Sequence, residues 1–88
     1  MEISFSNSFK RAFKKKIKGN QSLEDKFWDR IEIFKENPFD DRLKTHKLSG
    51  KLNELHSFSV AFDLRVIFSF FEKDKAIFLN IGSHEEVY

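Results

Sequence analysis

The stretch LHSFSVAFDLRVIFSFFEKDKAIFLNI, residues 55–81, decides the fold. Apolar residues occupy alternate positions in its first two segments: Phe58, Val60, Phe62, Leu64, Val66, Phe68 and Phe70. A period of two is typical of strands that bury one face, and the Lys73-Asp74 pair is typical of a tight turn. We therefore predict consecutive antiparallel strands over 55–61, 64–71 and 76–81, a β-meander.

Two amphipathic helices are predicted upstream of this meander. In the first, Phe9, Phe13 and Ile17 recur every four residues, between a cap at Ser6 or Asn7 and Gly19. The second opens at a Ser22 cap and ends before Pro38, and its apolar stripe is Leu23, Phe27, Ile31 and Phe34. A loop of about three residues joins the two helices, so we expect them to pack as an antiparallel hairpin.

Short strands are expected at 2–5, before the helices, and at 46–48, after a charged loop over 39–45. A chain of 88 residues has room for one hydrophobic core, so residues 1–88 are predicted to form a single domain. The predicted fold class is α+β: an N-terminal strand, an antiparallel two-helix hairpin, then an antiparallel β-meander.

The composition narrows the class of protein. Twelve of the 88 residues are Phe, so bulky rings supply much of the core volume. The absence of Cys excludes disulfides and thiolate metal sites and fits a reducing compartment. No apolar run has the length of a signal peptide core or a membrane span. We expect a cytoplasmic protein with no membrane partner.

Positive charge is concentrated near the start of the chain. Residues 1–19 carry one acid, Glu2, and six bases: Lys10, Arg11, Lys14, Lys15, Lys16 and Lys18. The bases are expected on the face of the first helix opposite its apolar stripe, where they are either a solvated surface or a set of phosphate contacts. Lys47 and Lys51 belong to a second basic segment, 42–56, and are further candidates for contacts with RNA.

No Gly-rich phosphate loop, HExxH, GxSxG or CxxC is present. Cutting RNA without a metal requires a base for the 2′-hydroxyl, an acid for the leaving 5′-oxygen and cations for the developing charge. Near the predicted strand ends lie residues of these types: His46, Asp63, Arg65, His84 and Tyr88. Each has a simpler interpretation by itself, because a histidine is usually solvated and Asp63 could end a turn and pair with Arg65. Their spacing does not favour a metal site.

Three blocks together resemble a known family. The segments THKLSGKL (45–52), FDLRVIF (62–68) and NIGSHEEVY (80–88) are similar, in order and spacing, to the C-terminal half of toxins of the RelE/ParE superfamily, particularly its YafQ-like branch. The resemblance implies a RelE-like fold and a ribosome-dependent endoribonuclease that cuts messenger RNA in the A site. It also implies a cognate antitoxin partner and no cofactor or metal.

The resemblance also assigns roles to residues. His46 matches an acid/base histidine, and Asp63 an active-site aspartate. Arg65 matches an arginine that holds the scissile phosphate. His84, in what is expected to be the last strand, matches a general acid, and Tyr88 matches an aromatic residue that stacks on or orients a base. Ser59 departs from the pattern because the relatives carry histidine or arginine there, and Lys47, Lys51 or His56 are candidates to replace that group.

Two other functions compete with the nuclease. One is a ParE-like poison of DNA gyrase that cleaves nothing. The other is a nucleic-acid-binding member of the superfamily without catalysis, for which Ser59 is the argument. The pair His46 and His84 favours the nuclease, since the ParE-like chains usually lack both histidines.

Overall fold

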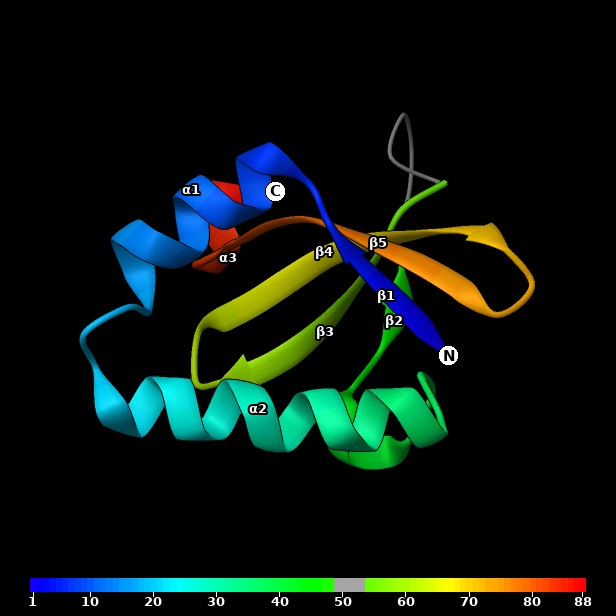
Figure 1. The fold of residues 1–88 in the computed structure, drawn as a ribbon, viewed down its shortest axis with the longest axis horizontal. Helices are drawn as coiled ribbons and strands as arrows, with labels where there is room; N and C mark the ends of the chain where they lie inside the picture. The colour runs from blue at the N-terminus through cyan, green and yellow to red at the C-terminus, as the bar shows by residue number, and fades with distance from the viewer. Residues whose placement is uncertain (49–53) are drawn as a thin grey trace.

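The computed structural model of the protein describes residues 1–48 and 54–88 (Figure 1). In these residues one sheet has the strand order β1-β5-β4-β3-β2. The strands are β1 (Glu2–Phe5), β2 (His46–Lys47), β3 (His56–Ala61), β4 (Leu64–Glu72) and β5 (Lys75–Gly82). The helices are α1 (Asn7–Lys16), α2 (Gln21–Glu36), the 3₁₀ turn η1 (Asp41–Leu43) and α3 (His84–Val87).

The predicted meander is confirmed, since β3, β4 and β5 pair antiparallel in sequence order. The sheet is nevertheless mixed, because β1 lies parallel to β5 with Ile3 opposite Ala76. The sequence pattern predicts a strand at 2–5 but does not predict its neighbour in the sheet. Phe62, expected on the apolar face, lies instead in the β3–β4 turn and is fully exposed, because a register shift between Ser59 and Ala61 ends the alternation there.

Both long helices begin at capping side chains. Ser6 caps α1 and accepts a hydrogen bond from the backbone N–H of Phe9 at 3.0 Å, as expected. Asn20, not Ser22, caps α2, because its side-chain oxygen already accepts the Leu23 N–H at 3.1 Å. Gly19 between the helices has φ of +91°, a left-handed conformation that favours glycine.

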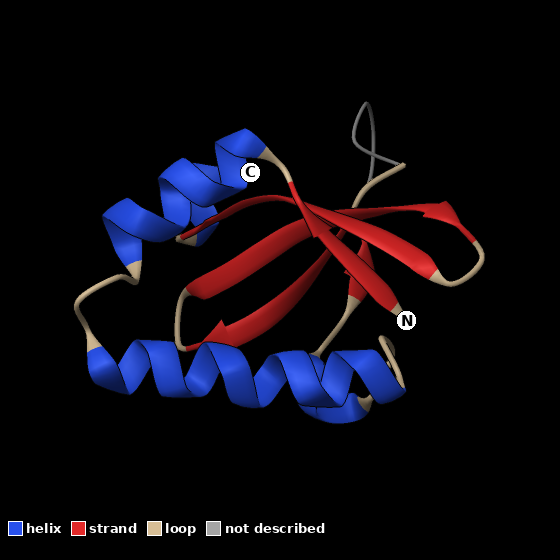
Figure 2. Ribbon diagram, in the orientation of Figure 1, coloured by secondary structure: helices blue, strands red, loops and turns tan. Residues whose placement is uncertain are grey.

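The helices cover one face of the sheet, with α1 against β5 and α2 against β3 (Figures 1 and 2). They run in opposite directions but splay apart, and they meet through the rings of Phe13 and Phe27, 5.0 Å between centroids. At the centre of the core, the Phe34 ring lies within 5.3 Å of three rings on three strands: Phe58, Phe68 and Phe78. The predicted α+β class is therefore confirmed, and aromatic packing holds its two layers together.

No helix among residues 1–48 and 54–88 is long and apolar enough to cross a membrane.

Candidate active site

The face of the sheet turned away from α2 carries two rows of residues that the strand pairing defines. In the first row, His46 lies opposite Ser57, Ser57 opposite Ile67, and Ile67 opposite Asn80. In the second row, Arg65 lies between Ser59 and Gly82. Paired residues share a face, and so do positions two apart along a strand. We call this surface, with α3 beside it, the site face.

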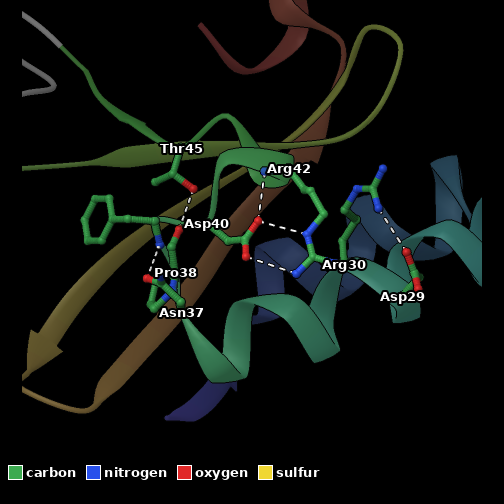
Figure 3. A network of polar contacts seen from close by, with 8 residues as sticks. Asp29, Arg30, Asn37, Pro38, Asp40, Arg42 and Thr45 are labelled. Atoms are coloured by element: carbon green, nitrogen blue, oxygen red, sulfur yellow. Dashed lines mark hydrogen bonds and ion pairs between the residues drawn. The ribbon is translucent and has the colours of Figure 1, made fainter.

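A network of polar contacts orders the segment that leads to His46 at the edge of this face (Figure 3). Asp40 accepts hydrogen bonds from the backbone N–H, Nε and Nη2 of Arg42, which lower its pKa to about 2. Thr45 Oγ1 donates to the Pro38 carbonyl at 2.6 Å. These contacts fix the course of residues 37–45, so the backbone at His46 is defined although β2 is only two residues long.

The segment 83–88 folds back against the sheet as the short helix α3. His84 was expected in the last strand, but β5 ends at Gly82 and His84 begins the helix. The reason is a capping box: the Ser83 hydroxyl accepts the Glu86 N–H, and Glu86 Oε1 accepts the Ser83 N–H at 2.9 Å. The motif Ser-x-x-Glu was visible in the sequence.

Two further features tie α3 to the body of the domain. Lys16 of α1 forms an ion pair with Glu86 and, with the Ser83 N–H, lowers the pKa of that carboxyl to about 2. Gly82 allows the close approach of the helix, because a Cβ there would lie 3.2 Å from Glu86 Cβ. The helix is thus fixed next to the Arg65 row of the site face.

Both predicted catalytic histidines lie close to the ring of Tyr88. Its centroid is 4.3 Å from that of His84 and 6.5 Å from that of His46, edge to face in both cases. Its hydroxyl is hydrogen-bonded to Ser57 Oγ. The end of the chain is therefore fixed against the sheet at Tyr88. Tyr88 is 39% exposed.

Asp63 and Arg65 lie at the end of the site face nearest α3. Asp63 occupies the β3–β4 turn at φ of +52°, a conformation that aspartate tolerates. Its Oδ1 accepts the backbone N–H of His84 at 3.1 Å, so it links this turn to α3 and is not simply the ion-pair partner of Arg65. Arg65 Nη1 is buried and has no hydrogen-bond partner within residues 1–48 and 54–88. A buried guanidinium N–H without a partner is costly, and a guanidinium is the side chain that pairs best with an anionic phosphate.

Two of the three candidates to replace the group missing at Ser59 do not lie on the site face. Lys47 and His56 form the pair next to His46 and Ser57 on the same two strands. Successive residues of a strand point to opposite faces, so these two lie on the face that the helices cover. His56 stacks on Phe68, and burial, then the charges of Lys47 and His46, lower its pKa. Lys51 lies outside the described residues. Ser59 Oγ donates a local hydrogen bond to the Ala61 carbonyl at 3.3 Å.

The six bases of the N-terminal region do not share one face of α1, contrary to expectation. Lys10, Lys14 and Lys18 line a hollow of about 420 Å³ between α1 and α2. Lys16 turns toward Glu86, and Arg11 and Lys15 are exposed. Residues four apart lie on the same side of a helix, whereas adjacent residues point about 100° apart. Adjacent bases, such as those at 14–16, therefore point in different directions around α1.

Ser57 is the site-face residue that the sequence analysis missed. It is fully buried, and its hydroxyl lies 3.4 Å from His46 Nε2 and in contact with the Tyr88 hydroxyl. The alternation of Ser57 and Ser59 with the buried Phe58 and Val60 indicated a polar face on β3. The pairing of Ser57 with His46 depends on the register between strands, which that pattern does not contain.

Solved structures with a similar fold include several bacterial toxins. A metal-bound toxin from Helicobacter pylori is 21% identical at a TM-score of 0.79, covering 100% of this chain and 99% of that one. YafQ from Escherichia coli is 18% identical at 0.71, covering 99% and 97%. YoeB in the YoeB-YefM complex of Staphylococcus aureus is 16% identical at 0.77, covering 96% and 97%. Comparison with curated protein sequences gives no match.

The fold is therefore the architecture shared by YafQ and the YoeB/ParE proteins. The family follows from the sequence, since residues 1–88 match the family described as the bacterial toxin of a type II toxin-antitoxin system, YafQ. The chain belongs to this family, and the predicted resemblance is confirmed. As a type II toxin it has a cognate antitoxin as partner.

Proposed function

We propose that this toxin is an endoribonuclease that cuts messenger RNA in the ribosomal A site. The observation that carries the proposal is the convergence of His46 and His84 on Tyr88, on the same face of the sheet as Arg65. A base, an acid, a stacking ring and a phosphate-binding cation are what metal-free RNA cleavage requires.

Each residue takes one role in this mechanism. His46 Nδ1 lies 3.4 Å from the Lys44 carbonyl, which can only accept, and in the tautomer with the proton on Nδ1 the basic nitrogen is Nε2. Nε2 removes the 2′-hydroxyl proton, and the 2′-oxygen attacks the phosphorus. His84 protonates the leaving 5′-oxygen, which yields a 2′,3′-cyclic phosphate and a 5′-hydroxyl. Arg65 holds the phosphate, Tyr88 stacks on a base, and Asp63 positions His84 through its backbone N–H.

The direct test is to map RNA 5′ ends after incubating the purified toxin with messenger RNA, with and without ribosomes. We expect cuts inside the A-site codon only when ribosomes are present, with 5′-hydroxyl ends and no effect of a chelator. Loss of cutting on chelation would replace the metal-free mechanism, a point that matters because the similar Helicobacter pylori toxin is metal-bound. Inhibition of gyrase supercoiling without any RNA cut would favour the ParE-like alternative.

Ribosome docking is assigned to the exposed bases of α1, Arg11 and Lys15. Reversing both to Glu should weaken binding to ribosomes, and the slope of log affinity against log salt should fall by roughly two, one for each lost phosphate contact. Lys16 is left unchanged because it holds α3 through Glu86. Pelleting with ribosomes over a salt series measures the effect. A Lys26→Glu, Lys73→Glu variant has the same net charge and should bind like the wild type; equal losses in both variants would contradict a specific docking surface.

The antitoxin contact is assigned to the hollow between α1 and α2. Its lining combines aromatic rings (Phe5, Phe9, Phe13, Phe27 and Trp28) with three bases and one acid: Lys10, Lys14, Lys18 and Glu24. An acidic segment with an apolar face complements such a surface. Trp28 is half exposed there, 51%, and is the only tryptophan of the chain.

Trp28→Ala should therefore weaken antitoxin binding by about 2 kcal/mol or more, roughly 30-fold, as expected of a tryptophan at the centre of an interface. Titration calorimetry measures the loss, and in the wild type the Trp28 fluorescence should shift to the blue on binding. Phe71→Ala removes another aromatic ring of equal exposure, 51%, on β4, and it is the matched control. Unchanged fluorescence on complex formation would place the antitoxin elsewhere.

A further inference from the structure

Ser57 is the only buried polar side chain among residues 1–48 and 54–88. It lies in the middle of the site face, with His46 opposite on β2 and Ile67 opposite on β4. A buried hydroxyl is costly unless it is hydrogen-bonded. Its two partners are the groups to which the proposed function gives roles, His46 Nε2 and the Tyr88 hydroxyl.

The direction of these bonds follows from the tautomer of His46. In the neutral tautomer with the proton on Nδ1, Nδ1–H faces the Lys44 carbonyl, Nε2 is an acceptor and Ser57 donates to it. A hydroxyl has one proton, so Ser57 then accepts from the Tyr88 hydroxyl. The chain runs from Tyr88 through Ser57 to His46, and it selects the tautomer in which Nε2 carries the lone pair.

We propose that Ser57 is a positioning residue: its hydroxyl fixes the tautomer of His46 and holds Tyr88 against the sheet, so that both are oriented before RNA binds. The importance of this for catalysis rests on the proposed nuclease function. The 3.4 Å contact with Nε2 is long, so a substrate hydroxyl can replace it. The 2′-hydroxyl proton then passes directly to Nε2, and Ser57 stays bonded to Tyr88.

The tautomer gives a test that needs neither ribosomes nor RNA. The ring ¹⁵N shifts of His46 in the purified toxin should show Nδ1–H as the neutral form, and Ser57→Ala should move the population toward Nε2–H. Ser57→Cys keeps the volume of the side chain with only a weak donor, so it should act like Ala and serves if the alanine variant fails to fold. Ser69→Ala, on the same face of β4, should leave the shifts unchanged. An unaltered His46 tautomer in both Ser57 variants would overturn the proposal.

Kinetics then separate positioning from a structural role. Ser57→Ala should lower kcat about tenfold, the equivalent of one lost hydrogen bond, with KM and melting temperature little changed. Ser57→Thr, which retains the hydroxyl on a strand-forming residue, should recover most of the loss. Tyr88→Phe should cost less than Ser57→Ala, and the double variant should be no slower than Ser57→Ala alone because both changes break one chain.

The outcomes distinguish the two proposals. If the tautomer shifts as expected but the wild type cuts no RNA, the nuclease fails while the role of Ser57 toward His46 stands. If the wild type cuts RNA and the Ser57 and Tyr88 changes are additive, with unchanged tautomers, the nuclease stands and Ser57 is only a packing residue.

Discussion

Replacing His84 with Gln is expected to slow ribosome-dependent RNA cleavage by about 100-fold or more, the usual contribution of a general acid or base. Glutamine can still form hydrogen bonds, but it cannot supply a proton near neutral pH as imidazole does. The helix should remain in place, because Asp63 accepts the backbone N–H of residue 84 and the capping box involves other residues. Single-turnover cleavage on ribosomes measures the loss.

The pH profile separates the two histidines. The acid must be protonated and the base neutral, so the wild-type rate should fall on both sides of an optimum. His84→Gln should lose the decline at high pH, and His46→Gln the decline at low pH. Glu85→Gln, an exposed neighbour in α3, is the control and should keep the full profile. If both histidine variants still arrest growth as the wild type does, the gyrase-poison function becomes the better explanation.

Arg65→Lys should also lower cleavage by about 100-fold, although the charge is kept. A guanidinium holds two phosphate oxygens in a fixed fork, whereas an ammonium acts as a point charge and cannot reproduce that geometry. Lysine keeps a long aliphatic stem between Ser59 and Gly82, so the fold should survive. Cleavage and thermal unfolding, measured on the same sample, report the two effects.

Arg30→Lys is the matched control for this change. Arg30 also carries a guanidinium, but it pairs with Asp29 on α2, in the helix layer and away from the site face. Its replacement should alter thermal unfolding slightly and leave the chemical step nearly intact. An Arg65→Lys variant that cleaves at the wild-type rate would show that Arg65 does not hold the phosphate.

The fold was largely predictable because its signals are local. The alternation over 55–81 and the stripes of Phe9, Phe13, Phe27 and Phe34 each predict one element and its buried face. The parallel pairing of β1 with β5 was not predictable, since it joins residues far apart in the chain and both strands are compatible with other neighbours. α3 was missed because the last block was interpreted as strand, although the Ser83 and Glu86 capping box is a local signal.

The site was predictable in its residue types and less so in its contacts. The resemblance named His46, Asp63, Arg65, His84 and Tyr88, and their catalytic roles stay predictions. The structure brings His46, His84 and Tyr88 together and leaves Lys47 and His56 on the opposite face. Ser57 could be found only from the strand register, because nothing in its local sequence distinguishes it from Ser59.

The parallel pairing of β1 with β5 also determines when the domain can finish folding during synthesis of the chain. Glu2 pairs with Lys75, so β1 cannot join the sheet until β5 has been synthesised. This pairing closes one of the longest loops of the chain, and contacts between residues far apart in sequence form late and slowly. A nascent chain that ends before β5 lacks both the strand on which α1 packs and the partner of β1. Both rows of the site face also end on β5, at Asn80 and Gly82. We therefore expect the domain to fold in one late step, with no partly active intermediate released earlier.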